Sequence, residues 1–304
     1  MNVAAAQSYP ARPVRIVVGN APGGATDIFA RLIGQWLSER LGQTFIVENR
    51  PGAGSNIAAE NVVRSPPDGH TLFLCASANA VNVTLYEKLT FDFRRDTTAV
   101  AIITREPLII TVHPSLPVKT LAEFIDYGKT NPGKLSFAST GNGTMPHIGG
   151  ELFKLMTGID MVHVPYRGGA PAMTDLIGGQ VQAAFLGPTV SIEHIKVGKI
   201  RALAVTSEVR AAALPDVPTA SESLAGYEVS QWFGIVAPKG TPTEIVDKLN
   251  SEVNSALNDA KVRARLIDLG GTVAPSSPSD FGKRIAEDAE RWAKVVRAAK
   301  IKTD

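Results

Sequence analysis

Residues 14–41, VRIVVGNAPGGATDIFARLIGQWLSERL, decide the fold class of this chain. Residues 14–19 are rich in β-branched side chains and predict a short strand. Gly23 and Gly24 interrupt that run, and from Ile28 apolar side chains recur at helical spacing until Gly42. The stretch therefore predicts a strand, a glycine-containing loop and a helix in succession, the repeating unit of an α/β protein.

The same alternation continues along the rest of the chain. Further strand-like or helix-like runs occupy residues 45–47, 57–63, 71–75, 135–139, 145–156, 161–164, 170–177, 181–186, 192–197, 201–205, 234–237 and 281–299. Such alternation predicts a parallel sheet covered by helices on both faces. Two β-like runs, 100–104 and 108–112, depart from the pattern because only three residues separate them.

This departure suggests that the chain passes from one domain into another. We expect a first, discontinuous domain of residues 8–103 plus 233–304, with residues 104–232 inserted as a second domain. The chain then crosses twice, near residues 104 and 231, and two crossings form a plausible hinge.

Composition narrows the classes of function. The 304 residues are 44% hydrophobic and 20% charged, and 31 basic against 29 acidic side chains leave a net charge of +2. This balance predicts a well-packed globular protein without a nucleic-acid-binding patch or a polybasic membrane tail. The apolar runs are shorter than the roughly 18 residues of a membrane-spanning helix.

The single cysteine and the first residues bear on the cellular compartment. Cys75 lies in a strand-like apolar run and is expected to be a buried core residue. The small residues 4–7 resemble the end of a signal peptide, which predicts an exported, processed protein. An ordinary disordered terminus is the alternative.

The loop at residues 19–27 is the first candidate binding site. Gly23 and Gly24 let the backbone approach a ligand, and the following helix offers free N–H groups and a positive dipole end. This suits a carboxylate or a phosphate, although a simple turn capped by Thr26 or Asp27 explains the pattern equally well. Asp27 would repel an anion and is expected behind the loop.

A second loop, residues 139–147, also joins a strand to a helix, but in the other predicted domain. It supplies neutral hydrogen-bonding groups around two glycines, from Ser139, Thr140, Gly141, Asn142 and Thr144. Such groups can hold a carboxylate without a counter-charge. His147 follows within the helix, where it either supports the loop or contacts the ligand.

A third loop, residues 164–171, has the same position between a strand and a helix. The backbone N–H groups of Gly168 and Gly169 can add to the same cleft. Arg167 is a candidate for recognising an anion, and a solvated arginine or one that braces the domains is the alternative.

The motifs of enzymes and metal proteins are missing. Residues 52–56 begin like a dinucleotide fingerprint, but Ile57 replaces its third glycine. There is no Gly-Lys-Ser/Thr phosphate loop, no Gly-x-Ser-x-Gly elbow, and no metal-ligand spacing among the five histidines. We therefore expect no catalytic residue, no metal and no cofactor.

Several of these stretches together resemble the Bug (TctC-like) receptors of tripartite tricarboxylate transporters. The matching stretches are residues 9–18 with 21–24, 47–54, 67–72, 139–147, 164–168, 198–205 and 237–242. The resemblance implies a periplasmic-binding-protein (Venus flytrap) fold, with two α/β domains and a cleft between them, and no enzymatic activity.

The resemblance also implies where a ligand binds. One ligand carboxylate would lie between the first loop, at Pro22, Gly23, Gly24 and Ala25 with bridging waters, and the second loop, at Thr140, Gly141, Asn142 and Thr144. Ser77, Ala78 and Asn79 match a further position that lines the cleft in the family. Phe185 and Leu186 match another, where many relatives carry Asp in place of Leu186; this departure argues against an amino-acid ligand. Side chains such as Thr189 and Trp232 are candidates for setting specificity.

These observations predict a periplasmic receptor that closes around a small di- or aromatic carboxylate and delivers it to the membrane permease subunits of such a transporter. We expect a monomer without nucleic-acid partners. A ligand sensor that signals to a membrane partner is one alternative, and an enzyme that uses the same cleft, such as a nucleotide-dependent transferase, is another.

Overall fold

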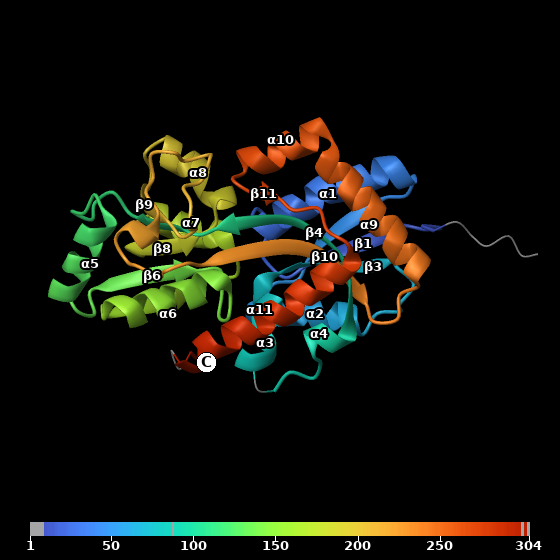
Figure 1. Ribbon diagram of the computed structural model, residues 1–304, viewed down its shortest axis with the longest axis horizontal. Coiled ribbons are helices and arrows are strands. Elements are labelled where there is room, and N and C mark those ends of the chain that lie inside the picture. Colours follow the sequence, from blue (N-terminus) through green and yellow to red (C-terminus); the bar gives the residue numbers. More distant parts are fainter. Residues whose placement is uncertain (1–8, 87, 299–300, 303–304) are drawn as a thin grey trace, which may run out of the picture.

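The computed structural model describes residues 9–86, 88–298 and 301–302, and shows two α/β units that lie side by side (Figure 1). The predicted signal-peptide remnant at residues 4–7 lies outside the described residues. Each unit has its own sheet, as expected for the predicted fold class.

The first unit is built on a six-stranded sheet. Its strands in spatial order are β11 (Thr272–Val273), β4 (Thr97–Pro107), β10 (Ser230–Pro238), β3 (Thr71–Ala76), β1 (Val14–Val18) and β2 (Phe45–Asn49). β1 runs parallel to β2 and β3, whereas β10 is antiparallel to both β3 and β4. The sheet is therefore mixed, not parallel as predicted, because β4 leaves the unit and β10 returns beside it in the opposite direction.

Helices cover both faces of this sheet, as predicted. One face is packed by α1 (Ala25–Leu41), α9 (Thr243–Asn258) and α10 (Ala260–Asp268). The other is packed by α2 (Asn56–Val63), which follows the short helix η1 (Ala53–Ser55), and by α3 (Ser77–Leu85), α4 (Phe93–Asp96) and α11 (Pro278–Ala298). Cys75 is buried in β3, as expected.

Helix α1 illustrates how the sequence produces these elements. Gly24 provides its N-cap in an extended conformation, and Gly42 ends it with a left-handed φ of 70°. Phe29, Ile33 and Leu37 are fully buried against the sheet. Burying each such side chain stabilises the fold by about 1.5–3 kcal/mol. These contacts hold α1 on the sheet and thereby fix the position of the loop that joins β1 to α1.

The second unit is built on a five-stranded sheet in the order β7 (Met161–Pro165), β6 (Leu135–Ser139), β8 (Ala183–Leu186), β5 (Ile109–Val112) and β9 (Arg201–Val205). β6 is parallel to β7 and β8, and β5 is antiparallel to β8 and β9. Side chains of α5 (Leu121–Thr130) and α6 (Met145–Thr157) enter one core cluster of this unit, and α7 (Gly169–Ile177) and α8 (Pro188–Lys196) pack in another. A short helix, η2 (Ala220–Glu222), follows β9.

Strands β4 and β10 carry the chain between the units (Figure 1). β4 stays in the first sheet up to Pro107, and β5 begins two residues later in the second sheet. Helix α11 also runs towards the second unit, because Phe281 and Ile285 pack on the first sheet whereas Trp292 and Val296 belong to a cluster that joins α3 to the core of the second unit. The domain boundaries near residues 104 and 231 stay a prediction.

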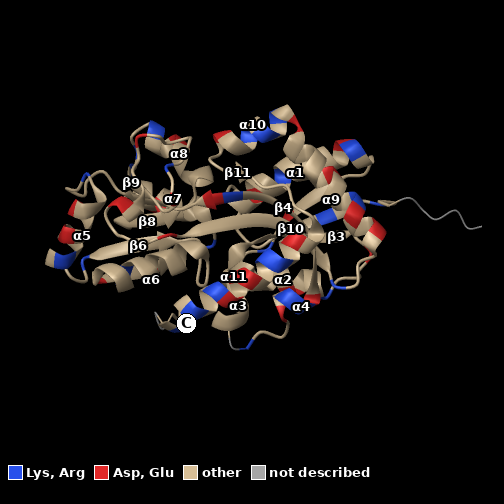
Figure 2. Cartoon of the chain, in the orientation of Figure 1, with Lys and Arg blue, Asp and Glu red and all other residues tan. Residues whose placement is uncertain are grey.

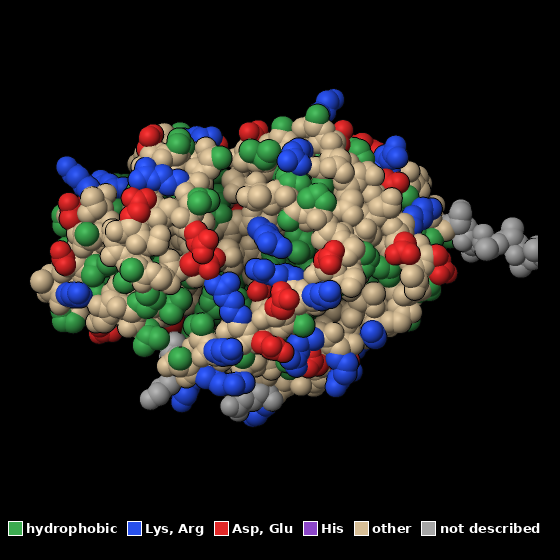
Figure 3. Space-filling model, viewed as in Figure 1, with side chains coloured by type: hydrophobic (Ala, Val, Ile, Leu, Met, Phe, Trp, Pro, Cys, Tyr) green, Lys and Arg blue, Asp and Glu red, His purple; other side chains and the backbone are tan. Residues whose placement is uncertain are grey.

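Charged residues lie mainly along the helices, with few on the strands (Figure 2). On the face shown in Figure 3, basic and acidic side chains are interspersed. Within the described residues, no helix is long and apolar enough to cross a membrane.

Candidate functional site

A cavity lies between the two units, where the loops after β1, β3, β6 and β8 meet the crossing strands. It encloses about 520 Å³ of empty space, counting the part open to solvent. The lining residues are Asn20, Gly24, Ala25, Thr26, Ser55, Ala76 and Ala78 from the first unit, Thr140, Thr144, Met145, Gly169, Gly187 and Val190 from the second, and Glu106, Gln231 and Phe233 from the crossing strands.

Six helix N-termini contribute to the wall of this cavity. The first turns or N-caps of α1, α2 and α3 come from one unit, and those of α6, α7 and α8 come from the other. The N-cap residues of α1, α2, α6, α7 and α8 form no side-chain cap hydrogen bond, although the backbone N–H of Thr189 in the first turn of α8 donates to Glu106. Each helix start carries the equivalent of about half a positive charge and presents unpaired N–H groups. The site therefore favours an anion, although no lysine or arginine is among the residues that line it.

The loop before α1 is fixed by an ion pair outside the cavity wall. The backbone N–H of Gly23 donates to Asp27 Oδ2 at 3.0 Å, and Arg31 donates from Nη2 to Asp27 Oδ1 at 2.9 Å. Burial opposes ionisation of Asp27, but the hydrogen bonds from Arg31 and Gly23 prevail and lower its pKa. Asp27 thus braces the loop from behind, as the sequence suggested.

The loop before α6 is fixed by two neutral imidazoles. His147 Nδ1 accepts a hydrogen bond from the N–H of Gly143 at 3.1 Å, and His163 Nε2 lies 2.6 Å from Ser139 Oγ. The two rings stack with centroids 3.9 Å apart. Burial, aided by Lys154, lowers the pKa of His147 to about 4, and burial together with His147 and Lys154 lowers that of His163 to about 3. Both rings are therefore uncharged at neutral pH.

The two units touch each other beside the cavity. The N–H of Ala21 donates to the carbonyl of Arg167 at 2.8 Å, and Tyr86 Oη donates to the carbonyl of Asn142 at 3.0 Å. Gly143 has a φ of +77°, and a Cβ atom there would lie 2.5 Å from Asn82 Oδ1. Only a residue without a side chain fits this approach between the second loop and α3.

The structure brings most of the predicted site residues together. Those that line the cavity are Gly24, Ala25, Ala78, Thr140, Thr144 and Gly169. Others belong to the same loops or helix starts without lining it, namely Pro22, Gly23, Ser77, Asn79, Gly141, Asn142 and Gly168. Ser139 and His147 support the second loop from behind. Their contacts with a ligand stay a prediction.

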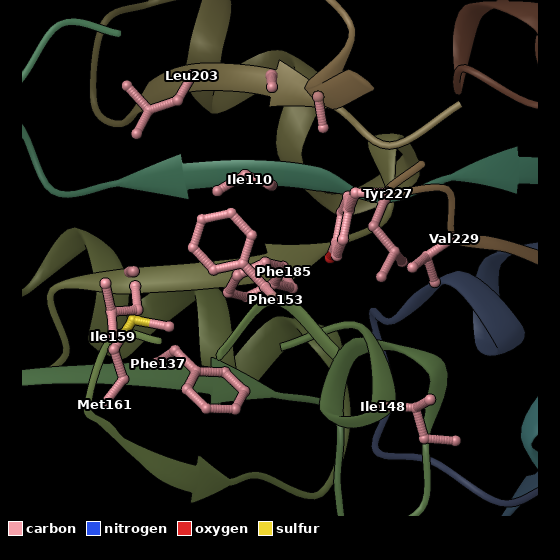
Figure 4. Close-up of a cluster of buried hydrophobic side chains, with 14 of the residues drawn as sticks. Ile110, Phe137, Ile148, Phe153, Ile159, Met161, Phe185, Leu203, Tyr227 and Val229 are labelled. Atoms are coloured by element: carbon pink, nitrogen blue, oxygen red, sulfur yellow. The ribbon is translucent and has the colours of Figure 1, made fainter. Parts of the chain in front are cut away.

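Three predicted residues lie elsewhere. Arg167 is exposed, and its backbone carbonyl accepts the hydrogen bond from Ala21 of the other unit. Phe185 lies in the core of the second unit among Phe137, Phe153 and Tyr227 (Figure 4), and Leu186 is equally buried in a neighbouring core cluster. Phe185 and Leu186 are not part of the cavity wall.

The suggested specificity residues are also engaged in other contacts. Trp232 Nε1 donates to Asp288 Oδ2, and both side chains are buried. Thr189 Oγ1 donates to Glu106 Oε2 at 2.7 Å and so reaches the cavity through that carboxyl group.

The sequence reasoning missed Glu106 and Gln231, which face each other in the β4–β10 pairing. It also missed eight other lining residues, namely Asn20, Thr26, Ser55, Ala76, Met145, Gly187, Val190 and Phe233. A signal for Glu106 was present, because a charged residue interrupts two apolar runs at the point where the chain was expected to cross.

A family model described as the tripartite tricarboxylate transporter family receptor, TctC, matches residues 29–301. The chain belongs to the TctC family. Protein BugT of Bordetella pertussis is a TctC-like relative by sequence, 37% identical over 302 residues that cover 98% of this chain and 93% of BugT.

Solved structures agree with this assignment. R. palustris Rpa4515 with adipate superimposes with a TM-score of 0.94 at 38% identity, covering 97% of this chain and 99% of the other. MatC from Rhodopseudomonas palustris with bound malate gives a TM-score of 0.91 at 36% identity, covering 95% of this chain and all of MatC. The two-domain fold of a periplasmic binding protein is thereby confirmed, and this TctC-family chain resembles receptors solved with small carboxylates.

Proposed function

We propose that this TctC-family protein is a periplasmic receptor that captures a small di- or aromatic carboxylate between its two units and delivers it to the permease of a tripartite tricarboxylate transporter. The observation that supports this most is the convergence of six helix N-termini on one cavity without a lysine or arginine in its wall. Helix starts and hydroxyl groups bind anions without a permanent counter-ion, which suits a ligand that must later be released.

Closure of the two units around the ligand is the proposed mechanism. The cavity wall is completed only when both units contribute, since three of the helix starts belong to each. A ligand that contacts both sets has a higher affinity for the closed arrangement and shifts the population toward it. The contacts of Ala21 with Arg167 and of Tyr86 with Asn142 would then mark the closed form.

Binding can be tested by isothermal titration of the purified protein with adipate, malate and benzoate. Hydrogen bonds to a charged group contribute about 1.5–3 kcal/mol each before entropic costs. A few of them make micromolar affinity reasonable, about −8 kcal/mol. If no mono-, di- or tricarboxylate binds or raises the melting temperature, the proposal is wrong.

A pair of threonine variants locates the binding site. Thr140 lines the cavity, whereas Thr130 is exposed at the end of α5. We expect Thr140→Ala to weaken carboxylate binding about tenfold through loss of a hydrogen bond to a charged group. Thr130→Ala should leave the affinity unchanged, and equal effects of the two variants would argue against this cavity.

Delivery to a permease needs a test in cells. Deleting the gene should abolish high-affinity uptake of the ligand that binds in vitro, and the wild-type gene should restore it. Intact uptake combined with a lost transcriptional response would instead identify a sensor. Size-exclusion chromatography with light scattering tests the proposed monomer, and NMR of the recovered ligand tests the proposed lack of turnover.

A further inference from the structure

Glu106 is an unusual residue for the wall of an anion site. It is the one ionisable side chain among the sixteen residues that line the cavity, all within the described part of the chain. It lies on β4 directly opposite Gln231 of β10, where the chain passes between the units. Only 1% of its surface is exposed. Burying a carboxyl group lowers the stability of the fold unless the group is hydrogen-bonded or paired with a charge.

The hydrogen bonds of Glu106 hold the carboxyl group in place without neutralising it. Gln231 Nε2 donates to Oε1 at 2.7 Å, and Thr189 Oγ1 donates to Oε2 at 2.7 Å. Burial raises the pKa of Glu106 to about 7, against the lowering effect of these hydrogen bonds and of a further one from the backbone N–H of Thr189. Gln231 is the one side chain among the described residues that donates to Oε1, and a carboxylate oxygen can accept two hydrogen bonds.

The elements packed against Glu106 place no charged partner on its carboxyl group within the described residues. Gly187, another cavity residue, lies against its carboxyl group, and a Cβ atom at that position would collide with Oε1. β10 contains no ionisable residue. The ionisable groups on the neighbouring elements are Arg105 on β4 with Arg284 and Asp288 near it, Glu193, His194 and Lys196 on α8, and Lys261, Arg263, Arg265 and Asp268 on α10. Within the described structure, none of these forms a hydrogen bond with Glu106.

We propose that Glu106 determines specificity by accepting a hydrogen bond from a hydroxyl or ammonium group that the bound carboxylate carries elsewhere on its carbon chain. This inference rests on the proposed function and adds a ligand class to it: hydroxy- or amino-substituted carboxylates bind better than unsubstituted dicarboxylates of the same length. The helix starts attract the ligand's carboxylate, whereas an ionised Glu106 repels a second carboxylate and favours a donor.

The proposal is tested by titrating matched ligands against the wild type and Glu106→Gln. The four-carbon series is succinate, malate and aspartate, and the six-carbon series is adipate, 2-hydroxyadipate and 2-aminoadipate. We expect the wild type to prefer the hydroxy or the amino member, and which one it prefers identifies the donor. In E106Q this preference over the unsubstituted acid should fall by at least about tenfold, because a charge-assisted hydrogen bond is lost.

Glu193→Gln is the matched control, since Glu193 lies on α8 in a groove outside the cavity. It should leave the preference unchanged. A merely structural role for Glu106 would weaken binding of all three ligands in parallel, and that result would overturn the proposal. If no member of either series binds the wild type, the proposed function itself fails, which is a separate outcome.

A second measurement uses the wild type alone and does not depend on whether E106Q folds. The ionised fraction of a carboxyl group with a pKa of about 7 rises about tenfold between pH 6 and 8. After correction for each ligand's own ionisation, the preference for the substituted acid should rise by up to that factor. A preference that stays the same between pH 6 and 8, or a preference for the substituted acid that rises as the pH falls, would overturn the proposal.

Discussion

The two loops that face each other across the cavity have the same position in their units but are braced by different chemistry. The loop before α1 is held by an ion pair between Asp27 and Arg31, and the arginine side chain is 56% exposed. The loop before α6 is held by the stacked, neutral His147 and His163. An exposed charge pair is sensitive to salt, whereas buried imidazoles are sensitive to acid. The same loop geometry is thus maintained by an ion pair in one unit and by uncharged rings in the other. Salt weakens the first arrangement and acid weakens the second.

The largest expected effect comes from filling the space between the second loop and α3. A Cβ atom in Gly143→Ala would lie 2.5 Å from Asn82 Oδ1 and 2.7 Å from Leu85 Cδ2, which opposes approach of the units. Overpacking of this kind costs about 1–3 kcal/mol. We therefore expect carboxylate affinity to fall between about fivefold and a hundredfold in a titration.

Gly158→Ala is the control for backbone strain. Gly158 has a φ of +73°, close to that of Gly143, but nothing lies within 4 Å of its missing Cβ atom. Both variants should lose similar stability, and only G143A should lose affinity. An equal loss of affinity in G158A would show that the close contact between the second loop and α3 is not what ligand binding depends on.

The next effect concerns acid. The pKa values of His147 and His163 are lower in the folded protein than the ordinary value of 6.5. The unfolded state therefore binds more protons below pH 6.5, so their contribution to stability is present above pH 6.5 and is lost as the pH falls towards 4. Between pH 6.5 and 5 each ring accounts for about 2 kcal/mol.

His163→Gln should reduce this acid sensitivity, because an amide can replace Nε2 as the partner of Ser139 and does not titrate. Urea unfolding at pH 7 and pH 5 measures the difference. A pH dependence as steep in H163Q as in the wild type would show that other groups cause the acid sensitivity.

The smallest effect concerns salt. Arg31→Ala should reduce the free energy of unfolding by no more than about 1 kcal/mol. Its partner Asp27 is buried, but the arginine side chain lies largely in water, which weakens the attraction between the two charges. The loss should shrink in 0.5 M NaCl, whereas the effect of H163Q should not depend on salt. Arg64→Ala, which removes an exposed pair with Glu60, provides the reference for a surface arginine.

The two loops could be predicted from sequence because each signal is local. Two glycines, a preceding strand and a following helix lie within a dozen residues in both cases. The covering of each sheet by helices followed from the same periodicity. Helix α3 was not predicted, because its sequence SANAVNVTL has low helix propensity. It is stabilised by packing against the distant helix α11.

Residues whose environment depends on distant contacts were not predictable. Glu106 is held by Thr189 and Gln231, which lie 83 and 125 residues further along the chain. The resemblance placed Phe185 and Leu186 at the ligand, but strand periodicity alone cannot say which end or face of a buried strand meets a cavity. In the structure both are part of core clusters.

The path of α11 also has a consequence for the order of folding. All five strands of the second sheet are complete in a chain synthesised up to Val205, yet Trp292 and Val296 belong to a hydrophobic cluster that joins side chains of that sheet to α3. A nascent chain can therefore form the second sheet early, but this cluster is complete only after α11 has left the ribosome. The strands of the second sheet follow one another in sequence, but the cluster that they share with α3 depends on the last helix for its final packing.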